Sequence, residues 1–364
     1  MAYLKPAQGN RARFTRLIGT GGIGSGILFL LQGDATMGRN ESRLGELTGA
    51  RDFCKLHIIF HYLAALLGPW AQVLPVGAVG ADEAGRALLA DMDAVGLSRR
   101  YIKVKSDAAT LYSVCFQYPD SAGGNITTSN SASGVFAPED LQAALAAIET
   151  DNGLCENQLV MAVPEVPFET RLALLRYGRE NGSYTVASIL AEEAESYLAN
   201  GGARLTDLLA VNRDEAAALA GIDAEGADTN ALVAACIQKL QADNPEITVL
   251  ITDGARGSYA CFGGSVTFTP ARKAHVVSTA GAGDAFLAGV LAGLCLGLPL
   301  CGEQSEALGG AADLGAAVAG MSVTSRDTIH FGITAAALRV HLETAAMTPL
   351  FGSVFPQNMQ QEGK

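Results

Sequence analysis

The chain has 364 residues, of which 49% are hydrophobic and 17% charged, and its net charge is −12 with a pI of about 4.9. A chain of this length and apolar content can bury a large core, which excludes global disorder, and its acidity without a basic cluster argues against nucleic acid as a partner. Seven scattered cysteines without a C-x-x-C pair predict free thiols in a reducing, cytoplasmic setting.

A first strand is predicted at 13–19, and it runs into a glycine loop at 19–24 with the sequence GTGGIG. The loop contains a literal G-x-G-x-x-G, so an NAD-dependent oxidoreductase is an alternative function. That fingerprint requires a helix after the third glycine to aim N–H groups at a pyrophosphate. Here residues 25–32 are short and β-like, which disfavours a dinucleotide site.

The next segments mix helix and strand signals. A helix is predicted at 55–67, where Gly68-Pro69 stops it, followed by a strand at 73–79 and a helix at 82–95. Residues 110–118 alternate between apolar and polar, and a turn at 119–124 leads into a second strand from Asn125. This hairpin is either a small β lid over a cleft or an ordinary surface hairpin.

From residue 138 onward, helical and strand-like segments alternate. The predicted helices span 138–148, 169–181, 214–219 and 230–241, and the predicted strands span 159–163, 185–189, 208–211 and 248–252. Such alternation is typical of a parallel sheet with helices on both faces. The sequence therefore predicts an α/β fold.

Residues 285–301 form an uncharged stretch whose length approaches that of a membrane span. Gly297 and Pro299 interrupt it, and no basic cluster flanks it. No apolar run follows the basic residues of the N-terminus either, so a secretory signal is not expected. We expect a buried helix in a large core and no membrane partner.

The sharpest signal is the segment 278–294, STAGAGDAFLAGVLAGL. A strand-like run at 275–277 leads into a Gly-Ala-Gly turn, and a helix is predicted to begin at or just after Asp284. Small residues leave backbone N–H groups bare at a helix N-terminus, which predicts an anion hole for a phosphoryl group. Its predicted donors are Ala280, Gly281, Ala282 and Gly283. Asp284 is the candidate general base.

The position of Asp284 has a second consequence. A helix N-terminus should lower the pKa of this carboxyl. A weak base can still serve phosphoryl transfer, because the loose transition state needs the proton removed only late. The alternative interpretation is structural: the GAGD sequence caps a buried helix, with Asp284 as the N-cap.

The segment at 278–294 resembles the second signature of the ribokinase-like (PfkB) family of carbohydrate and nucleoside kinases. Matches to other family motifs follow in order across 14–325: V76-G-A-V-G-A-D-E-A-G85, N212-R-D-E215 and T252-D-G-A-R-G257. The resemblance implies a three-layer ribokinase-like fold with a central, mostly parallel sheet and a small β lid. The lid would come from about 24–50 and 100–133 of a kinase domain at 1–325, and a C-terminal helix and tail would occupy 326–364.

The resemblance also implies an ATP- and Mg²⁺-dependent transfer to a hydroxyl group of a small, sugar-like acceptor. The residues that would bind the nucleotide are Asn212, Thr252, Gly254 and Gly257. Glu215 would hold Mg²⁺ indirectly, and the helix near 311–321 would lie by the adenine. A structural alternative exists for Asn212 and Glu215, which also fit a capping box. A nucleoside kinase and a non-catalytic nucleotide-binding member remain alternatives, and a homodimer paired through the lid is expected by resemblance.

The acceptor half departs from the family pattern. The usual Gly-Gly pair and Asn fall at Cys54-Lys55 and Ile59, the sugar-binding Asp is replaced near Gly24-Ser25, and the Asp that begins the signature is Ser278. Ser278 puts a monovalent-cation site in doubt. The residues predicted to bind the acceptor are Gly22, Arg39, Asn40 and Lys55, and we hypothesise an acceptor with an acidic or phosphate group. The alternative is a solvated loop and a helix with outward basic residues.

His57 and His61 lie four residues apart on one predicted helical face. Two histidines at this spacing can hold a metal ion. No third ligand is evident in the sequence, so a metal site is not expected here.

Overall fold

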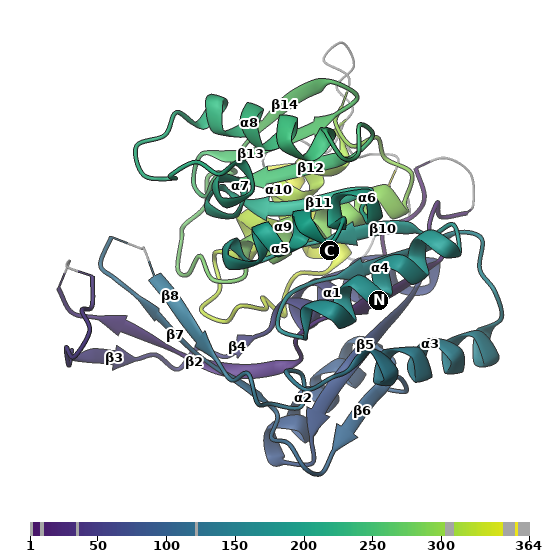
Figure 1. Cartoon of the computed structure of the whole chain (residues 1–364), viewed down its shortest axis with the longest axis horizontal. Coiled ribbons are helices and arrows are strands. Elements are labelled where there is room, and N and C mark those ends of the chain that lie inside the picture. Colours follow the sequence, from purple (N-terminus) through teal and green to yellow (C-terminus); the bar gives the residue numbers. More distant parts are fainter. Residues whose placement is uncertain are drawn as a thin grey trace.

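The computed structural model describes residues 3–7, 11–33, 36–120, 123–302, 309–344 and 354–355. Its larger sheet has nine strands, parallel from β6 to β12, with an antiparallel hairpin at one edge (Figure 1). In spatial order they are β14 (Ser265–Pro270), β13 (Gly257–Phe262), β12 (Thr248–Thr252), β11 (Leu208–Asn212), β10 (Tyr184–Ala187), β9 (Gln158–Ala162), β1 (Arg16–Thr20), β5 (Gln72–Gly80) and β6 (Ile102–Lys105).

Helices cover both faces of this sheet. On one face lie α1 (Lys55–Leu67), α2 (Glu83–Val95), α9 (Ala282–Cys295), α10 (Ala311–Ser322) and α11 (Ala335–Thr344). On the other lie α3 (Pro138–Asn152), α4 (Phe168–Glu180), α5 (Ala194–Ala199), α6 (Gly202–Leu205), α7 (Arg213–Ala220) and α8 (Thr229–Gln241). The short 3-10 turns are η1 (Gly68–Trp70) and η2 (Ala191–Glu193).

The strands alternate between these two cores, as the pleat of a strand requires. In β9, Leu159 and Met161 pack into the first core, whereas Val160 and Ala162 pack into the second. Because both faces are buried, the strand is apolar from Leu159 to Ala162 rather than alternating in polarity. The predicted three-layer α/β fold is confirmed.

A smaller sheet stands to one side of the large one, at the lower left in Figure 1. Its strands are β3 (Gly45–Leu47), β2 (Gly24–Leu31), β7 (Leu111–Gln117) and β8 (Gly123–Thr127), and β4 (Asp52–Phe53) also pairs with β2. β7 and β8 are the antiparallel hairpin expected from the alternation of apolar residues. The predicted lid range included Ile102–Lys105, which pairs instead with β5 in the large sheet.

α9 is the helix expected from the uncharged stretch, and all its residues from Ala285 to Cys295 are buried. It packs closely on α10, because a Cβ at Gly289 would lie 2.7 Å from the Cα of Gly315. None of the helices in the described parts of the chain is long and apolar enough to span a bilayer. The predicted strand at 275–277 is wrong: this segment is irregular, and its Val277 N–H donates to the carbonyl of Val323 outside any sheet.

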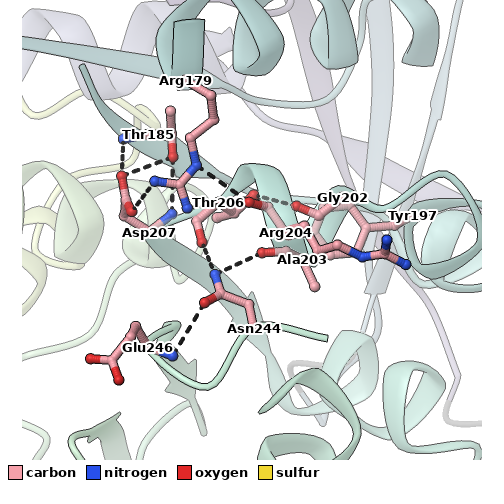
Figure 2. Close-up of polar contacts among 10 residues, drawn as sticks. All are labelled: Arg179, Thr185, Tyr197, Gly202, Ala203, Arg204, Thr206, Asp207, Asn244 and Glu246. Atoms are coloured by element: carbon pink, nitrogen blue, oxygen red, sulfur yellow. Dashed lines mark hydrogen bonds and ion pairs between the residues drawn. The ribbon is translucent and has the colours of Figure 1, made fainter. Parts of the chain in front are cut away.

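A polar network braces the amino ends of β10, β11 and β12 (Figure 2). The carboxylate of Asp207 accepts hydrogen bonds from the backbone and hydroxyl of Thr185 and pairs with Arg179 at 2.6 Å. The side-chain amide of Asn244 donates to the carbonyls of Ala203 and Thr206, each at 2.9 Å. The network ties α4, α6 and the strand ends together. The polar groups at this end of the sheet are therefore paired with one another.

Candidate active site

The turn before α9 has a backbone that only glycine adopts easily. Gly281 is the N-cap with φ of 77°, and a Cβ there would lie 2.6 Å from the carbonyl oxygen of Thr328. The helix begins at Ala282, two residues earlier than predicted, so Asp284 lies in the first turn. The alternative in which Asp284 is merely the N-cap is therefore wrong.

Three backbone N–H groups at this turn, those of Gly281, Gly283 and Asp284, have no acceptor among the residues that the structure describes. The N–H of Ala280 donates to Oγ of Ser278 at 3.3 Å, and that of Ala282 donates to the carbonyl of Thr279 at 3.2 Å. Two of the four predicted donors are thus engaged, and the amide of Asp284 is an additional bare one. Bare amides at a helix N-terminus attract anions.

Asp284 lies mostly buried beside one cation. Its Oδ1 is 3.6 Å from Nζ of Lys55, and its side chain is 15% exposed. Burial raises the pKa of Asp284, whereas Lys55 opposes that rise. The expectation that the helix end lowers this pKa is wrong, because desolvation outweighs the favourable charges. A raised pKa makes Asp284 a better proton acceptor than a surface carboxylate.

Two cavities meet at this turn. The larger has a volume of about 890 Å³ and extends along the carboxyl ends of β11 and β12, and the smaller has about 370 Å³ and lies under the small sheet. The residues that line both are Lys55, Thr279, Gly281 and Asp284. A molecule bound in one cavity would therefore face a molecule bound in the other, with Asp284 and the bare amides between the two.

The larger cavity collects all the residues predicted to bind a nucleotide and Mg²⁺: Asn212, Glu215, Thr252, Gly254 and Gly257. Both glycines have positive φ, 52° and 139°, so side chains are disfavoured there.

Asn212 and Glu215 also form the capping box that was the structural alternative. Oδ1 of Asn212 accepts from the N–H of Glu215 at 2.9 Å, and Oε2 of Glu215 accepts from the N–H of Asn212 at 2.7 Å. Burial raises the pKa of Glu215. Capping and cavity lining are therefore compatible roles of the same two side chains.

Glu165 is a site residue that the sequence analysis missed. It follows β9, lines the smaller cavity and has a φ of 78°, a conformation that costs a non-glycine residue about 1–3 kcal/mol. Burial raises the pKa of Glu165 to about 7, and its Oε2 accepts a hydrogen bond from the backbone of Lys55 at 3.2 Å. Its place after a parallel strand was the available signal, because ligands bind at the carboxyl ends of such strands.

Asp52 was also missed. It lies on β4 and lines the smaller cavity, where it accepts hydrogen bonds from Oγ of Ser113 and, at 3.2 Å, from Sγ of Cys115. These partners come from β7, which is distant in sequence. No local pattern could have placed Asp52 in the site, because its surroundings arise from the pairing of β2 with β4 and β7.

Of the four predicted acceptor residues, Lys55 lines the smaller cavity, and Gly22, Arg39 and Asn40 line neither cavity in the described parts of the chain. Arg39 and Asn40 lie on an exposed loop. Gly22 is buried behind Glu165, and a Cβ at Gly22 would lie 2.3 Å from Oε2 of Glu165. Gly22 therefore makes room for a cavity residue rather than lining the cavity itself.

The structure removes the oxidoreductase alternative. The glycine motif at 19–24 joins the end of β1 directly to β2, which begins at Gly24, so no helix N-terminus points at a pyrophosphate there.

His57 and His61 are buried on α1, and burial lowers their pKa to about 3 and about 4. No third histidine, cysteine or carboxylate joins them as a metal ligand in the residues that the structure covers. The seven cysteines are free, as expected.

Comparison with known proteins gives the same family as the sequence motifs. The family model described as pfkB family carbohydrate kinase matches residues 61–335. A fructokinase of Klebsiella pneumoniae is 36% identical over 96 residues, which span 26% of this chain and 29% of the fructokinase.

Two solved structures share the fold. Ribokinase of Giardia lamblia superposes with a TM-score of 0.74 at 19% identity, covering 91% of this chain and 99% of that one. Aminoimidazole riboside kinase of Salmonella enterica, complexed with aminoimidazole riboside and an ATP analogue, gives a TM-score of 0.63 at 19% identity, covering 90% and 100%.

Proposed function

The chain belongs to the pfkB family of carbohydrate kinases, and from that premise we propose that it transfers the terminal phosphoryl group of ATP to a hydroxyl group of a small, neutral, sugar-like acceptor. The observation that carries this proposal is the meeting of two cavities at Asp284 and Gly281. ATP occupies the larger cavity and the acceptor the smaller, so that the two reactants face each other across a carboxylate and an anion hole.

Asp284 is the general base of the proposed reaction. It accepts the proton of the acceptor hydroxyl as the oxygen attacks the terminal phosphorus, and general-base help of this kind contributes about 10²–10⁴ in rate. Burial raises the pKa of Asp284, which brings its basicity closer to neutral pH. The bare N–H groups of Gly281 and Gly283 donate to the phosphoryl oxygens while charge spreads over them.

The larger cavity fits ATP. Asn212, Thr252, Gly254 and Gly257 surround its phosphate end, at the carboxyl ends of β11 and β12. α10 contributes small residues to the same cavity, which would leave room for the adenine: Ala316, Ala319 and Gly320. The solved riboside kinase that shares this fold was complexed with an ATP analogue.

Mg²⁺ binding is proposed through Glu215. No cluster of three or more His, Cys, Asp or Glu that could hold a metal occurs in the described residues. This fits Mg²⁺, which usually keeps several waters and binds substrate phosphates with one or two carboxylates rather than a protein cage. Oε2 of Glu215 accepts a backbone hydrogen bond, which leaves Oε1 to hold a water bound to the ion. The ion would supply charge neutralisation at the phosphates.

The smaller cavity favours a neutral acceptor over the acidic one hypothesised from sequence. Asp52, Glu165 and Asp284 line it with carboxylates, and Lys55 is paired with Asp284. Carboxylates accept hydrogen bonds from hydroxyl groups and repel anions. Arg39 and Asn40, which suggested an acidic acceptor, do not line the cavity.

A nucleoside acceptor is the second candidate. Phe53 is among the residues that line the acceptor cavity, and an aromatic ring is suitable for stacking on a base. The riboside kinase that shares the fold carries a riboside in its structure.

We further propose a homodimer formed through the outer face of the small sheet. Leu28, Ser113 and Cys115 line the acceptor cavity, whereas their neighbours Ile27, Phe29 and Val114 lie on the opposite face of the small sheet. That outer face is apolar and in part exposed: Leu47 is 55% and Ile126 67% exposed. A second copy would cover it, and light scattering of the purified protein would give a mass of twice 37.6 kDa.

An acceptor screen tests the proposed function. The purified chain with ATP and Mg²⁺ is offered D-fructose, D-ribose, fructose 6-phosphate, inosine and aminoimidazole riboside, and ADP release is measured. Turnover with a neutral sugar is expected, turnover with inosine or the riboside alone would select the nucleoside candidate, and turnover with only the phosphorylated sugar would overturn the neutral acceptor. No release with any of the five would overturn the proposed function.

A further inference from the structure

Lys55 lies at the junction of the two cavities, as the first residue of α1. Within the described residues that line the acceptor cavity, it is the only lysine or arginine. Arg213, Arg272 and Lys273 line the nucleotide cavity alone. Among the described residues, Lys55 is therefore the cation that lines both cavities, between the two reactants of the proposed reaction.

The contact between Lys55 and Asp284 is an ion pair rather than a tight hydrogen bond. Nζ of Lys55 lies 3.6 Å from Oδ1 of Asp284, beyond the roughly 2.7–3.2 Å of an N–H···O hydrogen bond. The Lys55 side chain is 28% exposed, so packing does not lock it in place. An ammonium on a flexible stem can exchange one nearby anion for another.

Clustered negative charge keeps Lys55 protonated. Asp284 raises the pKa of Lys55 most, and Glu215 and Glu165 raise it further. In return Lys55 opposes the rise that burial causes in the pKa of each of these carboxyls. A terminal phosphate that enters the junction would meet this negative charge, and Lys55 is the side chain that offsets it.

We infer that Lys55 is a catalytic residue whose ammonium leaves Asp284 and donates to the phosphoryl group in transit. This inference rests on the proposed function. The acceptor oxygen forms a bond to the terminal phosphorus as the bond from that phosphorus to the bridging oxygen of ADP breaks. The electron pair of the broken bond leaves with ADP, and the acceptor proton passes to Asp284. Lys55 stays protonated throughout and releases the Asp284 carboxylate for that proton.

The competing role for Lys55 is to clamp an anionic group of the acceptor. That role would place Nζ toward the acceptor cavity alone. Lys55 instead lines both cavities together with Gly281, whose bare amide belongs to the anion hole. The two roles differ in the kinetic constant that Lys55 controls: transfer affects kcat, whereas an acceptor clamp affects KM.

The test uses Lys55→Met, which removes the charge at similar length, with Lys103→Met as the matched control on the distant edge strand β6. The acceptor is whichever of the five screened compounds the wild-type chain turns over fastest. For Lys55→Met we expect kcat to fall about 100-fold or more, with the KM of the acceptor and the Kd of ATP changed less than about threefold. Lys103→Met should match the wild type.

Two further readouts separate a catalytic from a structural role. ADP with aluminium fluoride mimics the planar phosphoryl group, so it should bind the wild type more tightly than ADP alone, and Lys55→Met should lose this gain. The acid limb of kcat/KM, which reports the free enzyme, should move to higher pH in the variant, because Asp284 loses the cation that lowers its pKa. Should Lys55→Met misfold by circular dichroism, Lys55→Ala with ethylammonium in solution replaces it, and saturable rescue of kcat is expected.

Several outcomes would overturn the role of Lys55. In Lys55→Met they are a raised acceptor KM with unchanged kcat, or an affinity for ADP that aluminium fluoride increases as much as in the wild type. In Lys55→Ala, the outcome is a kcat that ethylammonium does not restore. If the wild type transfers phosphate and Lys55→Met does so equally well, the role of Lys55 fails and the proposed function stands. If the wild type transfers to none of the five acceptors, the proposed function itself fails.

Discussion

The two ends of the large sheet carry the same kinds of side chain in opposite arrangements. At the amino end, Asp207 accepts hydrogen bonds from Thr185 and pairs with Arg179, so its carboxylate is surrounded by donors (Figure 2). At the carboxyl end, Asp284 and Glu165 both interact with Lys55, the only lysine or arginine in the described lining of the smaller cavity, and burial raises the pKa of both. A carboxylate with donors on every side stabilises the fold, whereas one that lacks them is available to a ligand.

The backbone shows the same contrast. The side chain of Asn244 covers the carbonyls of Ala203 and Thr206 at the amino end. The N–H groups of Gly281 and Gly283 have no acceptor in the described chain at the carboxyl end. Half-buried backbone groups are nearly always paired, so the bare N–H of half-buried Gly281 marks a place where another molecule completes the hydrogen bond, with the exposed Gly283 beside it.

The largest expected effect comes from Asp284→Asn, which keeps the shape of the side chain and removes the base. Transfer should fall by about 10²–10⁴, while the Kd of ATP stays within about threefold. Stability should not fall, because the substitution removes a buried charge whose pKa burial raises. Steady-state ADP release and thermal unfolding measure the two effects on the same preparation.

Asp207→Asn is the reciprocal control at the amino end. It removes the charge that pairs with Arg179 and leaves the Thr185 donors with a weaker acceptor. The free energy of unfolding should fall by about 2 kcal/mol, whereas kcat per folded molecule should be unchanged. A loss of stability in Asp284→Asn, or a loss of kcat in Asp207→Asn, would contradict the division into a structural amino end and a functional carboxyl end of the sheet.

The fold could be predicted from the sequence because its signals are local. The helix at 55–67 ends at Gly68-Pro69 as expected, and α2 begins after the cap Asp82 and ends before Gly96, which takes the left-handed conformation. The alternation of strands and helices from 138 onward also follows the prediction. Period, caps and turn residues act within a few positions of one another, so a single sequence contains them.

The same difference between local and distant signals separates the two cavities of the candidate site. The residues predicted to bind a nucleotide do line one cavity, because they sit in contiguous motifs, such as Asn212 with Glu215 and the turn at Gly281. The lining of the other cavity could not be predicted in this way, because Asp52 reaches the cavity through pairing with strands far away in the chain. Arg39 and Asn40 were chosen because they lie in the segment where the acceptor half departs from the family pattern, and position along the chain does not say which loops face a cavity.

A smaller effect is expected from Glu165→Gln, which tests the carboxylate of the acceptor cavity. Burial raises the pKa of Glu165 to about 7, so the wild-type carboxylate is protonated as the pH falls below neutrality. A protonated carboxyl accepts hydroxyl hydrogen bonds less well, so the acceptor KM of the wild type should rise between pH 8 and pH 6. In Glu165→Gln the KM should be about tenfold higher at pH 8, or about 1.4 kcal/mol, and flat over this range.

Glu169→Gln is the matched control, because Glu169 is exposed on α4 only four residues away. It should retain the wild-type KM and its dependence on pH. A KM that keeps rising toward pH 6 in Glu165→Gln would assign that titration to another group, and Glu165 would lose its place in acceptor binding.

The smallest effect at neutral pH concerns His57, a buried polar residue that belongs neither to the network at the amino end of the sheet nor to the site at its carboxyl end. It is fully buried on α1 against Phe53, and neither of its ring nitrogens has a hydrogen-bond partner in the described chain. Unpaired buried nitrogens cost stability, so His57→Leu should raise the free energy of unfolding by about 1 kcal/mol at pH 7. His275→Leu, at an exposed position, should change it by less than about 0.5 kcal/mol.

The pH dependence gives the sharper form of this test. Burial lowers the pKa of His57 to about 3, so the folded chain keeps the ring neutral while the unfolded chain protonates it below about pH 6.5. The unfolded state then binds more protons, and wild-type stability falls as the pH drops, by up to about 1.4 kcal/mol per pH unit for this ring. His57→Leu lacks this contribution, so its advantage over the wild type in urea unfolding should widen from pH 7 to pH 5. An advantage that stays constant would mean that His57 is protonated in the folded chain, and hence that it has a partner.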